Sequence, residues 1–135
     1  MLREIRRWVG GAVRSWFIPF AVLVIVCGSA ARSWGQQEVA ISEDDFKKLD
    51  TFEGAALSKA DKVFAQKEWR QATAEYDSFI LTYPKSTATA YAVLRKARCI
   101  QLDNKRYEAI KAYNEVLDYF PNALNYAAAA LYYIG

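Results

Sequence analysis

A stretch of 16 residues occurs twice in this chain, and this repeat limits the possible folds more than any other feature. The first copy is residues 69–84 (WRQATAEYDSFILTYP), and the second is residues 106–121 (RYEAIKAYNEVLDYFP), 37 positions later. The aligned pairs are Ala72 with Ala109, Tyr76 with Tyr113, Phe79 with Val116, Ile80 with Leu117, Tyr83 with Phe120 and Pro84 with Pro121. Their spacing of i, i+4, i+7, i+8 and i+11 places them on one face of an α-helix. Each copy is therefore predicted to be an amphipathic helix that ends at its aromatic-proline pair.

The repetition continues toward the N-terminus of each copy. Leu57, Ala60 and Val63 precede Leu94, Ala97 and Ile100 by the same 37 positions. Each unit is therefore predicted to be a pair of helices, and the period lies in the range of helical solenoids. Small residues at matched positions allow packed helices to approach closely. They are Ala60 and Ala72 in the first unit, and Ala97 and Ala109 in the second.

The combined pattern resembles the tetratricopeptide repeat (TPR). The residues that carry the resemblance are Ala60, Ala72, Tyr76, Phe79 and Pro84, and again Ala97, Ala109, Tyr113, Val116 and Pro121. It covers about residues 53–135 and implies an all-α, helix-turn-helix solenoid of two repeats plus the first helix of a third. The sequence departs from the family at Lys59 and Lys96, where leucine is usual, and at Arg106, where an aromatic residue is usual. Its period is also longer than the usual one of about 34 residues.

Longer repeats with Tyr-Pro-x-Ser at the junction, here residues 83–86, resemble one bacterial subgroup of TPR proteins. This subgroup contains the outer-membrane-protein assembly lipoprotein and the Tol-Pal system coordinator. Residues 120–135 (FPNALNYAAAALYYIG) also resemble the start of a further repeat in the assembly lipoprotein. Terminal repeats need a polar outer face, and this stretch has none. Either the natural chain continues beyond Gly135, which we favour, or this surface meets another chain.

The first 35 residues have the layout of a secretory signal peptide. Basic residues precede an apolar run at 16–31, and small residues follow it. The basic residues are Arg3, Arg6, Arg7 and Arg14. The run has 16 residues and contains Pro19, whereas a membrane-spanning helix needs about 20 apolar residues, so cleavage is favoured over a retained anchor. Cleavage after Ala30, Ala31 or Gly35 fits equally well.

Two alternatives for this leader stay open. Residues 16–31 would anchor the protein in the inner membrane if they were retained. Cys27 would carry a lipid in a lipoprotein, although Val26 stands before it where a small residue is expected. We divide the chain into a signal peptide or anchor (1–35), a linker (36–42) and a helical repeat domain (43–135).

The basic character of the chain comes mostly from the leader. The whole chain has 18 Lys and Arg and 15 Asp and Glu, of which the leader holds five and one. Residues 36–135 therefore carry 13 basic and 14 acidic groups, a net charge of −1. This balance argues against nucleic acid as a partner.

Helices are predicted at 43–66, 69–83, 87–102, 105–120 and 123–135, and no segment alternates long enough to indicate a strand. Ser42, followed three positions later by Asp45, is typical of a helix start. Gly54 interrupts the apolar stripe of the first helix, and we expect a break in the helix there.

The sequence offers little chemistry for catalysis. It has no histidine, which is the usual general base and the commonest metal ligand. Cys99 lies on an apolar helical stretch and is predicted to be a buried hydrophobic residue. Asp44 and Asp45 are expected to be solvated charges at a helix start, and Tyr132 and Tyr133 to pack against a further helix. We therefore predict no enzyme activity, catalytic residue, cofactor or metal.

The TPR resemblance implies a partner-binding groove lined by the first helix of each unit. Carried over by register, the groove positions are Leu57, Asp61 and Phe64, and then Tyr91, Leu94, Arg98 and Gln101. The two-lysine, two-asparagine pattern of members that bind chaperone tails is absent, since Leu57, Asp61, Leu94 and Arg98 occupy those places. The competing interpretation of Leu57 and Leu94 is that they are simply core residues.

Together these features predict a non-catalytic scaffold for protein or peptide partners. We expect it to be exported to the periplasm or the cell envelope, with membrane contact only through its N-terminal segment. Outer-membrane protein assembly or envelope coordination are the roles that the resemblance implies. The alternative is that these repeats are the N-terminal module of a longer enzyme or of a membrane-tethered protein.

Overall fold

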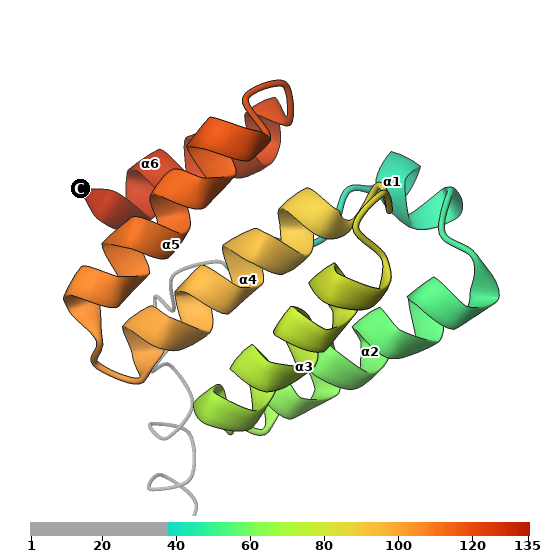
Figure 1. The fold of residues 1–135 in the computed structure, drawn as a ribbon, viewed down its shortest axis with the longest axis horizontal. Coiled ribbons are helices and arrows are strands. Elements are labelled where there is room, and N and C mark those ends of the chain that lie inside the picture. The colour runs from blue at the N-terminus through green and yellow to red at the C-terminus, as the bar shows by residue number, and fades with distance from the viewer. Residues whose placement is uncertain (1–37) are drawn as a thin grey trace, which may run out of the picture. The chain divides into compact units, whose positions relative to one another are not determined.

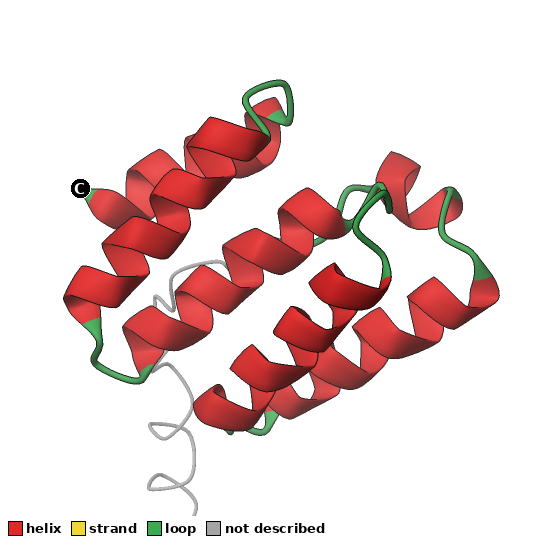
Figure 2. Cartoon of the chain, viewed as in Figure 1, coloured by secondary structure: helices red, strands yellow, loops and turns green. Residues whose placement is uncertain are grey.

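Six α-helices in series make up the part of the chain that the computed structural model describes, residues 38–135 (Figure 1). They are α1 (Glu43–Lys47), α2 (Thr51–Ala65), α3 (Trp69–Thr82), α4 (Thr89–Leu102), α5 (Arg106–Tyr119) and α6 (Leu124–Ile134). Figure 2 shows only helices and loops over this range, so the all-α class is confirmed there. The leader at 1–35, the apolar run at 16–31 and Cys27 lie outside the described residues. Within 38–135, no helix is long and apolar enough to cross a membrane.

The predicted helix at 43–66 is wrong, because α1 ends at Lys47 and α2 begins at Thr51. The break does not fall at Gly54, which lies inside α2. Its cause is a capping box: the Asp50 carboxylate accepts a hydrogen bond from the Thr51 amide at 2.7 Å, and the Glu53 carboxylate accepts one from the Asp50 amide at 3.1 Å. These side chains bind amide groups that a continuous helix would have paired internally. Ser42, the predicted cap, makes no such bond with its side chain.

The backbone repeats with the same 37-residue offset as the sequence. Helices α3 and α5 begin at residues 69 and 106 and end at 82 and 119. The turns before them also correspond, since Lys67 has φ 63° and Asn104, 37 positions later, has φ 64°. In each turn two amides bond back to the preceding helix in the Schellman pattern, Lys67 to Phe64 and Glu68 to Val63 in the first turn. The two sequence units therefore form two similar helix pairs.

Helix α4 lies between α3 and α5 in Figure 1 and also contacts α6. Helix α2 packs against α3, and α6 packs against α5. Ten of the 14 residues of α4 are buried, so this helix is the centre of the core. The four alanines predicted to lie at the helix crossings are all buried, with exposed fractions of 0 or 1%. Burial of Ala60, Ala72, Ala97 and Ala109 agrees with the close helix packing expected from their size.

Helix α4 begins at Thr89, two residues later than predicted. The Thr89 hydroxyl donates to the carbonyl oxygens of Tyr83 at 3.0 Å and Ser86 at 2.9 Å. These bonds hold the connection from α3 in a compact turn before the helix starts.

At the other end of the domain, α6 exposes large apolar side chains. Leu124, Leu131 and Tyr132 are 74, 59 and 70% exposed.

Candidate functional site

Residues 38–42 run across the helices without forming a helix or strand, and we call them the covering segment. Glu38 binds α4, while Val39 and Ile41 are half-buried against the core and Ala40 is exposed. At the end of the segment, the Ser42 amide donates to the Tyr126 hydroxyl of α6 at 2.9 Å. The sequence had assigned residues 36–42 to a linker, but from Glu38 onward this stretch is packed against the domain.

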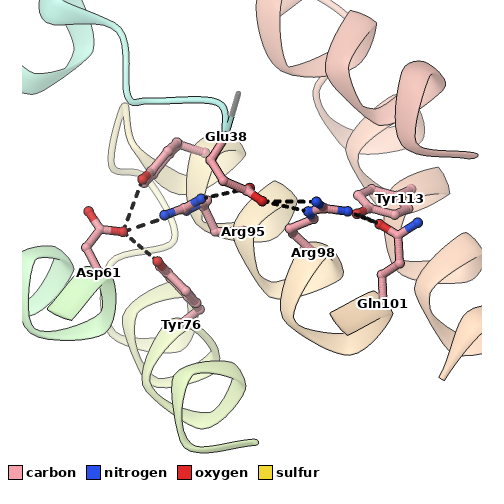
Figure 3. Close-up of polar contacts among 8 residues, drawn as sticks. Glu38, Asp61, Tyr76, Arg95, Arg98, Gln101 and Tyr113 are labelled. Atoms are coloured by element: carbon pink, nitrogen blue, oxygen red, sulfur yellow. Dashed lines mark hydrogen bonds and ion pairs between the residues drawn. The ribbon is translucent and has the colours of Figure 1, made fainter. Parts of the chain in front are cut away.

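The Glu38 carboxylate bridges two arginines of α4 (Figure 3). Its Oε2 accepts from Arg95 Nη1 at 3.2 Å, and its Oε1 accepts from Arg98 Nε at 3.0 Å. Oε1 also lies 3.0 Å from Arg98 Nη2. The two arginines are three positions apart and therefore share one face of the helix. Both are buried, with exposed fractions of 9% for Arg95 and 6% for Arg98.

Scaffold residues hold each guanidinium in place. Arg95 lies over the Phe64 ring, 3.7 Å from its centroid, and Arg98 lies 4.6 Å from the Tyr133 centroid. These are cation-π distances. Arg98 also donates from Nη1 to the Gln101 side-chain oxygen at 2.7 Å, and that oxygen accepts from the Tyr113 hydroxyl at 2.8 Å.

Asp61 of α2 joins the same polar cluster from the opposite side. Its Oδ1 accepts from the hydroxyls of Tyr76 and Tyr91, the second at 3.1 Å, and lies 3.9 Å from Arg95 Nε. Burial, followed by the Asp61 charge and its hydrogen bond, raises the pKa of Tyr76. Burial disfavours the charge on Arg98, but the hydrogen bond and charge of Glu38, followed by the nearby hydroxyls of Tyr113 and Tyr133, together outweigh burial and raise the Arg98 pKa. At neutral pH the Tyr76 hydroxyl therefore stays neutral and the Arg98 guanidinium stays cationic.

An open cavity of about 380 Å³ lies beside the covering segment, along α2. It is lined mostly by apolar groups, from Ile41, Phe46, Gly54, Leu57, Ser58, Asp61, Lys62 and Ala65. A Cβ built on Gly54 would meet nothing within 4 Å, so this stretch of the α2 surface is open.

The seven residues predicted to line the groove differ in how far they are buried. Leu57, Phe64, Tyr91, Leu94 and Arg98 are buried, and Asp61 and Gln101 are half-buried. Phe64, Tyr91 and Asp61 meet around Arg95, and Arg98 meets Gln101. Leu57 lines the cavity although it is only 2% exposed, whereas Leu94, 1% exposed, is a core residue.

Sequence reasoning missed Arg95, Glu38 and Tyr133. The available signal was a pair of arginines, Arg95 and Arg98, on one face of a helix that is otherwise nearly free of charge. Two buried cations need acidic partners, so the pair could have prompted a search for one. Nothing in the sequence pattern singles out Glu38 as that partner.

The remaining chemistry of the described residues is limited. Burial raises the pKa of the Cys99 thiol to about 12, so it stays protonated at neutral pH and is a poor nucleophile. Cys99 is fully buried, as predicted. Asp45 departs from the expected solvated role, because its carboxylate accepts a hydrogen bond from the Tyr126 hydroxyl at 2.9 Å. Across residues 38–135, no three His, Cys, Asp or Glu side chains gather closely enough to hold a metal ion.

Comparison of the chain with known protein families, with curated proteins and with solved structures gives no match.

Proposed function

We propose that this protein is a non-catalytic, TPR-like scaffold that holds a protein or peptide partner on the face formed by α2, α4 and α6. The observation that carries the proposal is the covering segment. It lies on this face as an extended chain, with one charged and two apolar side chains inserted and one exposed. A face that accommodates an extended segment of its own chain has the shape and polarity needed to accommodate one from another protein.

The cavity along α2 supports the same function. Its volume of about 380 Å³ lies within the range of binding sites, and its lining combines apolar groups with the Asp61 carboxylate. The 37-residue repetition of the helix pairs supports the TPR-like solenoid, whose groove would be this face. The more specific role that we propose rests on the sequence resemblance alone. It is outer-membrane protein assembly or Tol-Pal envelope coordination, after export to the periplasm or the envelope. Inner-membrane anchoring by residues 16–31 is the alternative location.

A second candidate is that these helices form the N-terminal module of a longer enzyme or of a membrane-tethered protein. The apolar side chains exposed on α6 favour a further element against that helix, since large apolar patches mark interaction surfaces.

Site-specific photo-crosslinking in the native cells tests the leading proposal. A photoreactive residue in place of Ser58, which is exposed and lines the α2 cavity, is expected to give a discrete adduct with one partner. The same residue in place of Gln71, which is exposed on α3 and does not line this cavity, is the matched control. No adduct from Ser58, or the same adducts from both positions, would contradict a partner-binding role for this face.

A further inference from the structure

The two arginines beneath the covering segment form a site that is built without it. Besides Glu38, the arginines contact Phe64, Gln101 and Tyr133, which all lie outside residues 38–42. Gln101 is itself fixed, because its side-chain nitrogen donates to the Tyr133 carbonyl at 3.3 Å and its oxygen accepts from Tyr113 at 2.8 Å. The guanidinium groups are therefore preorganised, and a carboxylate that binds them need not order them first.

Glu38 is more exposed than the two arginines that it binds. Its side chain is 34% exposed, whereas those of Arg95 and Arg98 are 10 and 8% exposed. Figure 3 shows its carboxylate between the two arginines, on the side from which the covering segment approaches. Solvent therefore reaches the Glu38 side chain more than the two guanidinium groups, as it also reaches Asp61, whose side chain is 35% exposed. Glu38 belongs to a segment with no regular secondary structure.

The charges of the cluster balance only with Glu38 present. Arg95 and Arg98 face two carboxylates in Figure 3, Glu38 and Asp61, and Asp61 is already shared between Tyr76 and Tyr91. Departure of the covering segment would remove one negative charge from a site with two buried cations. Such a site favours the return of a carboxylate over water, because buried charge is costly without a counter-charge.

The side chains after Glu38 add an apolar requirement. Val39 and Ile41 pack against the core, whereas Ala40 is exposed. A chain that binds here in the same way therefore presents an acidic residue, followed by apolar residues one and three positions after it. Ile41 also borders the open cavity along α2. A longer ligand could therefore continue from this position into the cavity.

We propose that the Arg95–Arg98 pair recognises a glutamate or aspartate within an extended segment of a partner protein, and that Glu38 occupies this site in cis. The partner's acid replaces the Glu38 carboxylate, its apolar residues replace Val39 and Ile41, and residues 38–42 act as an internal competitor. This inference rests on the proposed scaffold function and adds the chemistry of the partner and a means of control.

Fluorescence anisotropy on the full chain in a mild detergent tests the proposal. The probe is a labelled peptide with the sequence of residues 36–43, QQEVAISE, blocked at both ends. The receptor variant is Glu38→Gln, which keeps the shape of the side chain but removes the charge that competes with the peptide. We expect the peptide to bind Glu38→Gln at least tenfold more tightly than the wild type.

Three controls separate recognition from non-specific attraction. Glu43→Gln removes a carboxylate that is 91% exposed, and it should bind as weakly as the wild type. A peptide with glutamine in place of its first glutamate should lose binding to Glu38→Gln. Within the Glu38→Gln background, Arg98→Gln should lose binding and Arg106→Gln, an exposed arginine of α5, should retain it. The peptide exchange leaves the receptor unchanged, so it decides the question even if Arg98→Gln fails to fold.

Equal affinity of the wild type and Glu38→Gln, or equal binding of the glutamate and glutamine peptides, would overturn the proposal. A wild-type dimer in sedimentation equilibrium that Glu38→Gln dissociates would also overturn it, because the occupant would then be the covering segment of a second copy. If the peptide fails to bind while Ser58 still gives its specific adduct, the carboxylate site is wrong and the scaffold function stands. If the peptide fails to bind and Ser58 gives no specific adduct, both the carboxylate site and the scaffold function are rejected.

Discussion

Alanine at the helix crossings is the residue-scale feature on which both helix pairs depend. Ala60, Ala72, Ala97 and Ala109 are buried at corresponding positions, and larger side chains there would push the helix axes apart. The same four positions were identifiable from the sequence, because small residues recur there at the repeat period. Close packing of this kind leaves little room for an added methylene group.

Replacement of Ala109 by leucine tests this packing. Ala109 is 1% exposed on α5, so we expect Ala109→Leu to lower the free energy of unfolding by about 1–3 kcal/mol through overpacking. The exposed Ala74 on α3 is the matched control, and Ala74→Leu should change stability by less than about 0.5 kcal/mol. Chemical denaturation of the two variants gives both values. Equal stabilities would place Ala109 away from a tight crossing.

The polar cluster shows why part of the candidate site was not predictable at the residue scale. Asp61, Arg98 and Gln101 were predicted as groove residues because the TPR resemblance implies a groove along that register of the first helix of each unit. Glu38 binds Arg95 across 57 positions of sequence, and it comes from a segment with no periodic pattern. The contact between Glu38 and Arg95 depends on where the folded helices place the arginine. The local sequence around Glu38 therefore does not predict it.

At the scale of the helical elements, the first break in the chain is controlled by a cap. The apolar stripe continues from Phe46 through Phe52, and it predicted one helix, yet the Asp50 and Glu53 side chains end that continuity. Phe46 and Phe52 are 57 and 73% exposed, so at these positions the apolar spacing indicates neither a buried face nor the break, and the cap decides where α2 begins. The later boundaries agree with the sequence within two residues because proline or a repeated turn marks each of them.

Removal of this cap should destabilise α2 selectively. Asp50→Ala loses the acceptor for the first-turn amide, so we expect stability to fall by about 1 kcal/mol. Ser42→Ala is the matched control, since Ser42 occupies the same position before α1 but its side chain makes no capping bond. Thermal unfolding followed by circular dichroism compares them. A larger loss for Ser42→Ala would show that the cap has been assigned to the wrong residue.

The turns that follow α2 and α4 each contain one residue with a positive φ angle, and this affects stability. Lys67 has φ 63°, in the left-handed region that costs an L-residue other than Asn or Asp about 1–2 kcal/mol. Lys67→Gly should therefore raise the free energy of unfolding by about 0.5–1 kcal/mol, the net after glycine's added freedom in the unfolded chain. Asn104→Gly, at the corresponding turn, should gain less because asparagine tolerates this conformation. Urea denaturation would contradict the argument if Lys67→Gly proved less stable than the wild type.

At the scale of the described domain, buried tyrosines link the helix pairs to one another. Tyr76 and Tyr91 bond Asp61 from α3 and α4, Tyr113 bonds Gln101 from α5, and Tyr126 of α6 bonds Asp45. Burial is the first cause that raises the pKa of each of these four hydroxyls above the ordinary value near 10, for Tyr126 to about 12. The folded protein therefore keeps them neutral at pH values where the unfolded chain ionises them.

This difference predicts alkaline unfolding, and its sign follows from proton linkage. Below pH 10 the four tyrosines are neutral in both states, so their stabilising contacts are fully present. Above pH 10 the unfolded chain releases protons that the folded one retains, and each tyrosine then favours unfolding by about 1.4 kcal/mol per pH unit. Four such groups would remove roughly 6 kcal/mol per pH unit, comparable with the whole stability of a small domain.

We therefore expect cooperative unfolding between about pH 10 and pH 12, the range bounded by the unfolded pKa and the folded pKa of Tyr126. The loss of helical circular dichroism should coincide with the part of the rise in tyrosinate absorbance at about 295 nm that comes from the four buried hydroxyls, because these ionise only as the helices separate. Absorbance that rises to its full value while the helical signal is unchanged would show that the hydroxyls reach solvent in the folded state. The tyrosine contacts would then not be what holds the helix pairs together.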